Sequence, residues 1–190
     1  MFPNFRLSEH ALLGLREARD GVHPTSIPPR IAGRGTFSAD PRVRDSQYAL
    51  VRMVSIVESY IDSMALAIVE ARVDSGVATQ ALLLADWEVS STSSWDKRSS
   101  SFFKHLGVRL SDCAGHPELK AAIEIRNSIA HALGALTARQ RSDSRLAIQL
   151  ALIGATVGGG AIHLGANTLR LTCDACVALV CDVDARVPLT

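Results

Sequence analysis

Arg126, Asn127 and His131 lie together in the segment EIRNSIAHALGAL, residues 124–136. The arginine guanidinium is a fixed positive charge whose planar fork matches two phosphate oxygens. The histidine imidazole, which titrates near pH ~6.5 in peptides, can take up or release a proton at neutral pH. Asn127 precedes His131 by one helical turn and could orient the imidazole or a phosphate. These residue types suit RNA cleavage without metal, which needs two proton transfers and a cation to stabilise the charged transition state.

The helical pattern places Arg126 on a face that should be buried. At 100° per residue, the segment has an apolar arc, which contains Leu119, Ala122, Ile123, Ile125, Ile129, Ala130 and Leu133. The opposite arc is polar, with Lys120, Glu124, Asn127, Ser128 and His131. A guanidinium keeps its charge and is rarely buried alone. Arg126 should therefore have a partner. One interpretation is an ion pair with a carboxylate of the same bundle, Glu58 or Asp62, in which case His131 is only a surface residue.

The segments that must position these residues are mostly helical. A long helix is predicted from Asp40 at the cap and Pro41 at its first position to Gly76. The motif lies in a second predicted helix over residues 115–136, with Pro117 in its first turn.

Other elements are predicted on either side of these two helices. A short helix over 7–19 is followed by a Pro- and Gly-rich connector over 20–35, so residues 1–39 are separated from a helical domain of residues 40–190. Residues 77–89 predict a shorter helix, and residues 155–164 predict two β segments around a glycine turn. A last helix spans 167–187, capped by Asn167 or Thr168. The expected fold is all-α, an up-and-down bundle with a small β-hairpin inserted before the last helix.

Composition narrows the possible functions without choosing one. The chain has 190 residues and a net charge of only +1, so a nucleic-acid surface must be a local patch. The uncharged stretch 146–169 contains three consecutive glycines and suits a turn better than a membrane span. The start of the chain does not look secretory, so we expect a cytoplasmic protein with reduced thiols. Cys173, Cys176 and Cys181 lack the second ligand pair of a zinc site, and we expect no metal and no cofactor.

The pattern Arg126, Asn127 and His131 resembles the R-N-x-x-x-H signature of the HEPN superfamily, all-helical proteins that include many metal-independent endoribonucleases. The order of the predicted helices over roughly residues 40–187, with Trp95 and the segment FFKHLGVRL (102–110) between them, is also similar to that family.

The resemblance implies an endoribonuclease that cleaves RNA with Arg126 and His131 as catalytic residues and Asn127 beside them. It also implies a homodimer through the 117–135 helix, with Arg126 projecting into a cleft where RNA phosphate can be its partner. A further implication is a role in defence or growth control as a toxin or antiviral effector. A neighbour-encoded antitoxin or regulatory protein is an expected partner. Leu133 stands where HEPN toxins silenced by a nucleotidyltransferase carry tyrosine, which does not favour that type of silencing. The alternative function is a non-catalytic HEPN module that binds RNA or a protein partner.

Overall fold

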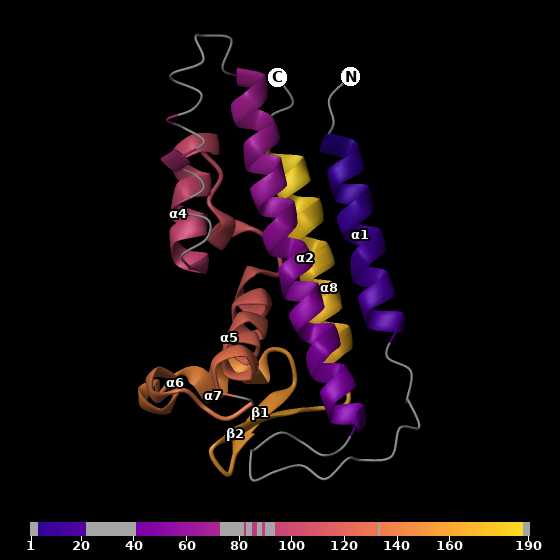
Figure 1. The fold of residues 1–190 in the computed structure, drawn as a ribbon, viewed down its shortest axis with the longest axis vertical. Helices are drawn as coiled ribbons and strands as arrows, with labels where there is room; N and C mark the ends of the chain where they lie inside the picture. Colours follow the sequence, from indigo (N-terminus) through magenta and orange to yellow (C-terminus); the bar gives the residue numbers. More distant parts are fainter. Residues whose placement is uncertain are drawn as a thin grey trace.

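Helices dominate the structure of this chain (Figure 1). A computed structural model describes residues 4–21, 41–72, 94–132 and 134–187, together with residues 82, 85, 86 and 89. Its elements are, in order, α1 Asn4–Asp20, α2 Pro41–Arg72, α4 Trp95–Leu106, the 3₁₀ helix η1 Leu110–Asp112, α5 His116–Ala132, α6 Ala138–Ser142, α7 Leu146–Ala151, β1 Ala155–Gly158, β2 Ala161–Leu164 and α8 Thr168–Arg186. The predicted all-α fold with a hairpin before the last helix is confirmed.

The long helices alternate in direction along the chain. Helix α1 runs against α2, since Glu17 accepts from Arg52 at 3.5 Å while the other end of α1 lies by Ser63. Helix α8 runs in the same direction as α2 and packs against both α1 and α2 (Figure 1). Helix α5 runs against α2, so that its polar C-terminal half lies beside the middle of α2.

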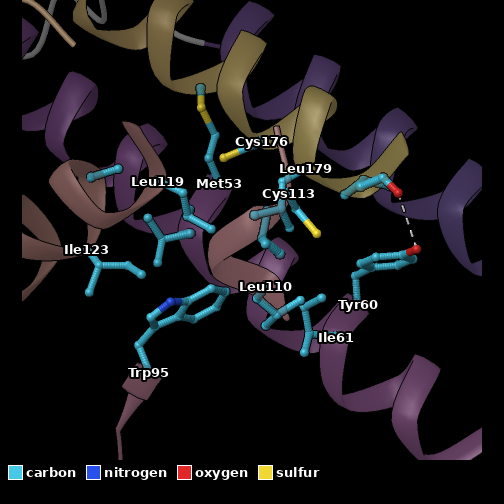
Figure 2. Close-up of a cluster of buried hydrophobic side chains, with 14 of the residues drawn as sticks. Met53, Tyr60, Ile61, Trp95, Leu110, Cys113, Leu119, Ile123, Cys176 and Leu179 are labelled. Atoms are coloured by element: carbon cyan, nitrogen blue, oxygen red, sulfur yellow. Dashed lines mark hydrogen bonds between the residues drawn. The ribbon is translucent and has the colours of Figure 1, made fainter. Parts of the chain in front are cut away.

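The buried side chains of all the long helices form one hydrophobic core. Figure 2 shows part of it, with Trp95 from α4, Leu119 and Ile123 from α5 and Leu179 from α8 drawn around the same centre. Helix α1 contributes Leu15, which is fully buried. The predicted division at residue 40 stays a prediction, because residues 22–40 lie outside the described part of the chain.

Most of the predicted helix boundaries match the structure to within a few residues. Helix α2 begins at Pro41, while its predicted cap Asp40, its predicted end at Gly76 and most of the predicted 77–89 helix lie outside the described residues. Helix α8 begins at Thr168, with Asn167 in the cap position. The Asn167 side chain makes no capping hydrogen bond; the Thr168 hydroxyl instead accepts from the Gly165 amide at 2.9 Å.

The predicted β-hairpin forms between α7 and α8. Strands β1 and β2 pair antiparallel with Ala155 opposite Leu164, and Gly159 and Gly160 turn the chain with positive φ angles of 57° and 77°. The Leu136 amide donates to the Gly160 carbonyl at 2.8 Å and fastens this turn to the chain that follows α5. None of the described helices is long and apolar enough to cross a membrane.

A buried tyrosine ties α2 to α8. The Tyr60 hydroxyl donates to Asp184 Oδ1 at 2.5 Å. Figure 2 shows Tyr60 with its hydroxyl directed towards α8. Burial and this carboxylate raise the pKa of Tyr60 far above its usual value. Tyr60 therefore acts as a neutral hydrogen-bond donor that fixes the two helices, which form the wall behind the motif helix.

Candidate functional site

A cavity of about 560 Å³ lies where α5 meets the start of α4 and the start of α6. All three motif residues line it. The described residues that line it are Ser94, Trp95, Asp96, Lys120, Ile123, Glu124, Arg126, Asn127, His131, Thr137 and Arg139. The structure therefore brings the three predicted site residues together around one space, from one helix and at the spacing that the sequence predicted.

Arg126 forms an ion pair with Glu58 of α2 through its Nη2 atom. Its side chain is 25% exposed, and its Nε atom is buried with no hydrogen-bond partner in the described structure. The structure thus contains both features that the sequence left as alternatives. Arg126 pairs with a bundle carboxylate, as one interpretation predicted, and it lines a cavity with His131, as the other predicted.

Glu58 is shared between two arginines. Its Oε1 atom also accepts from Arg98 of α4 at 3.2 Å, and Arg98 makes two further hydrogen bonds to Asp62 at 2.8 Å and 3.1 Å. The Arg98 side chain is only 10% exposed. Arg98 therefore links both α2 carboxylates to α4. Glu58 would keep Arg98 as a cationic partner if the Arg126 side chain moved away from it.

Asn127 and His131 present free polar groups to the cavity. Asn127 is half-buried and His131 is exposed near the C-terminal end of α5. Neither side chain forms a hydrogen bond or ion pair within the described part of the chain. Both are accordingly available to a ligand, in contrast to Arg126.

The predicted arcs of α5 are wrong at three positions, two on the polar arc and one on the apolar arc. Glu124 and Ser128 are buried, whereas Ala130, which was assigned to the apolar arc, is exposed. The reason is that α2, α7 and α8 all pack on α5, so the buried surface extends beyond one apolar arc. Ser128 tolerates burial because its hydroxyl donates to the Ile125 carbonyl at 2.8 Å.

The buried Glu124 carboxylate accepts hydrogen bonds from two side chains of α6. Gln140 Nε2 donates to its carboxylate at 2.9 Å and to its backbone carbonyl at 2.8 Å. Arg139 Nη2 donates to both carboxylate oxygens at 2.7 Å and 2.5 Å, and this contact raises the pKa of Arg139. Gln140 is itself fixed by a capping box with Thr137. The start of α6 is therefore held rigidly against α5.

The sequence analysis did not single out Lys120, Asp96 or Arg139 as site residues. Lys120 donates to Asp96 at 2.6 Å across the cavity, from α5 to α4. The one local signal was the Thr137-x-x-Gln140 pattern, which is typical of a helix start and places Arg139 in a first helical turn. Nothing in the spacing indicated that this turn would fold back onto α5.

A second histidine lies behind the cavity wall. His116 Nε2 accepts from Trp95 Nε1 at 3.4 Å, and Trp95 is buried. Burial lowers the pKa of His116, and the neighbouring Lys120 lowers it further. His116 is therefore neutral at physiological pH and structural, since protonation of Nε2 would break its bond to Trp95.

The apolar side of α5 is used within the chain itself. Leu119, Ile123 and Ile125 are buried against α2, α7 and α8, while Leu133 lies outside the described residues. Ala130 and His131, near the C-terminal end of α5, are exposed and could contact a second copy.

Two of the three cysteines of α8 belong to the core. Cys173 and Cys176 are buried and Cys181 is exposed. Burial raises the pKa of the Cys176 thiol well above its usual value, which makes it a poor metal ligand and nucleophile. Within the described residues, no group of three or more histidine, cysteine or acidic side chains is placed to hold a metal ion.

Comparisons with protein-family models, with curated proteins and with solved structures found no significant match to this chain.

Proposed function

We propose that this protein is a metal-independent endoribonuclease of HEPN type whose active site is the cavity at the C-terminal half of α5. The observation that carries the proposal is that Arg126, Asn127 and His131 line one cavity, in which two of the three have no partner in the described structure. Arginine, asparagine and histidine are the groups that charge stabilisation, orientation and proton transfer at a phosphodiester require.

The reaction follows from the roles of these groups. The ribose 2′-oxygen attacks the adjacent phosphorus while its proton passes to a base, and the 5′-oxygen leaves with a proton from an acid. The products are a 2′,3′-cyclic phosphate and a 5′-hydroxyl. His131 performs one of the two proton transfers, Arg126 stabilises the negative charge on the phosphorane, and Asn127 positions the imidazole or a phosphate oxygen.

The Arg126–Glu58 pair is compatible with this role. A phosphate entering the cavity competes with Glu58 for the guanidinium, and the unpartnered Nε is a further donor that can turn towards it. Glu58 retains its bond to Arg98 when Arg126 moves, so no carboxylate is left unpaired. The cost of freeing Arg126 is therefore lower than it would be for an isolated buried pair.

The proposal includes a homodimer. Among the described residues, His131 is the one histidine that lines the cavity, whereas the reaction needs two proton transfers. A two-fold contact near the exposed end of α5 would place a second His131 beside the first. Like charges brought together in this way repel, and a bound phosphate backbone relieves the repulsion, so RNA should tighten the dimer.

Sedimentation of the His131→Ala protein across a dilution series tests this part of the proposal. The dimer should persist to lower protein concentration in the presence of an RNA oligonucleotide than in its absence. A species that binds RNA and stays monomeric at every concentration would show that the site is built within one chain.

A non-catalytic module that binds RNA or a protein partner is the second candidate function. The observation in its favour is that Arg126 is already engaged by Glu58 in the free protein. In that case the cavity would bind a partner and no bond would be cleaved.

Paired variants separate the two functions. Arg126→Ala and His131→Ala should each abolish RNA cleavage and relieve any growth arrest caused by overexpression. Cys173→Ser, which changes a buried residue that is not among the lining residues of the cavity, should retain both effects. Equal toxicity and equal RNA cleavage in all three variants would reject the assigned residues.

A further inference from the structure

Arg139 projects a second guanidinium to the cavity, from a different element than the motif. It lies in the first turn of α6 and lines the same space as Arg126 and His131. Its side chain is 64% exposed, so most of its surface faces solvent. A cation in this exposed position can bind a polyanionic substrate that enters the cavity.

The position of Arg139 is fixed by buried groups. Its Nη2 contacts both oxygens of Glu124, whose side chain is only 9% exposed. Glu124 is in turn held by Gln140, which the capping box with Thr137 orients. An arginine that is anchored in this way loses little side-chain entropy when it binds a ligand.

The anchor uses one end of the guanidinium. Arginine has five N–H donors in a planar fork, and the contact to Glu124 employs Nη2 alone. Nε and Nη1 have no hydrogen-bond partner in the described structure. The Nε–H lies on the same edge as Nη2, whereas the two N–H groups of Nη1 remain for the oxygens of a phosphate.

We propose that Arg139 forms a second phosphate subsite of the cavity, which binds the RNA backbone at a phosphate next to the scissile one, with Glu124 as its positioning residue. This subsite rests on the proposed function, because it assumes that the ligand of the cavity is RNA. It also explains how a carboxylate can line a cavity that binds an anion, because Arg139 offsets the charge of Glu124 and Gln140 donates to it.

The test measures binding of a single-stranded RNA oligonucleotide with 2′-O-methyl groups, which cannot be cleaved because the attacking hydroxyl is blocked. The logarithm of the affinity falls with the logarithm of salt concentration, with a slope of about 0.7 per phosphate contact on a single strand. Arg139→Ala should reduce the slope by about 0.7 and weaken binding. Arg145→Ala removes the same charge from an exposed position outside the cavity lining and should leave the slope unchanged.

Removal of Arg139 alone leaves a buried carboxylate without its cation, which could unfold the protein. The pair Glu124→Gln and Glu124→Gln/Arg139→Ala avoids this, since glutamine carries no charge to compensate. The salt slope should fall between these two variants by the same amount. Equal slopes in this pair would overturn the subsite.

The two proposals fail in different ways. If unmodified RNA is cut and Arg139 does not affect the salt slope, the subsite is wrong and the endoribonuclease stands. If the oligonucleotide binds through Arg139 and unmodified RNA is never cut, the subsite stands and the catalytic function is wrong. If RNA neither binds nor is cut, both are wrong.

Discussion

Arg98 and Arg126 share the carboxylate of Glu58, yet their replacement by methionine should have very different effects on stability. Arg98 makes three hydrogen bonds to Glu58 and Asp62 and is 10% exposed. In Arg98→Met, Asp62 loses its guanidinium partner within a largely buried network. Removing one partner of a buried pair costs about 3–5 kcal/mol. At about 2–4 °C per kcal/mol for a chain of this size, the melting temperature should fall by roughly 6–20 °C.

Arg126→Met should change the free energy of unfolding by less than about 1 kcal/mol. The variant loses one hydrogen bond between charged groups, worth about 1.5–3 kcal/mol, but Glu58 keeps Arg98. It also removes the buried Nε donor that has no partner, a penalty of about 1–3 kcal/mol, so the two terms nearly cancel. The methionine chain retains the packing of the arginine stem.

Urea denaturation of both variants, followed by circular dichroism, measures this difference directly. The account predicts that Arg98→Met loses at least about 2 kcal/mol more than Arg126→Met, as the two estimates above imply. A loss in Arg126→Met as large as that in Arg98→Met would refute the reasoning. Arg126 would then be a structural residue of the bundle, and its place at the cavity would be incidental.

Three further predictions concern residues of the fold outside the cavity lining. Burial lowers the pKa of His116, so the unfolded chain binds a proton at this imidazole more tightly than the folded chain does. The contribution of neutral His116 to the free energy of unfolding should therefore be fully present above pH ~6.5 and be lost as the pH falls below that value. His116→Gln should show a smaller fall in melting temperature than wild type between about pH 7.5 and 5.5; equal falls would contradict it. Iodoacetamide should label the exposed Cys181 in the native protein and spare Cys176, as read by mass spectrometry, whereas labelling of both at similar rates would place Cys176 at the surface. Gly115→Ala should destabilise the fold far more than Gly107→Ala, although both have positive φ, because only at Gly115 would a Cβ lie 2.2 Å from a backbone oxygen of α8; similar melting temperatures would contradict that close approach.

The sequence predicted those parts of the fold that depend on local patterning. Pro41 at the start of α2, the 3.6-residue period of α5 and the glycines of the hairpin turn are signals that act over a few residues. Helices α6 and α7, of five and six residues, were not predicted, because helices this short form through tertiary packing rather than periodicity.

The prediction of the site succeeded within α5 and failed across elements. Arg126, Asn127 and His131 were grouped by their spacing on one helix. Burial of Glu124 was missed because helical periodicity assigns a carboxylate to solvent, and only the fold shows that Gln140 and Arg139 satisfy it. Contacts that join α4, α5 and α6 depend on packing that no short-range pattern encodes.

The most direct test of the central claim is the chemistry of the RNA ends that the purified protein produces in EDTA. Attack by the 2′-hydroxyl, assisted by His131 and Arg126, requires no metal and conserves the phosphate on the 3′ side. The account predicts cleavage that continues in EDTA and leaves 2′,3′-cyclic phosphate or 3′-phosphate ends with 5′-hydroxyl partners. Cleavage that stops in EDTA, or fragments with 3′-hydroxyl ends, would contradict it.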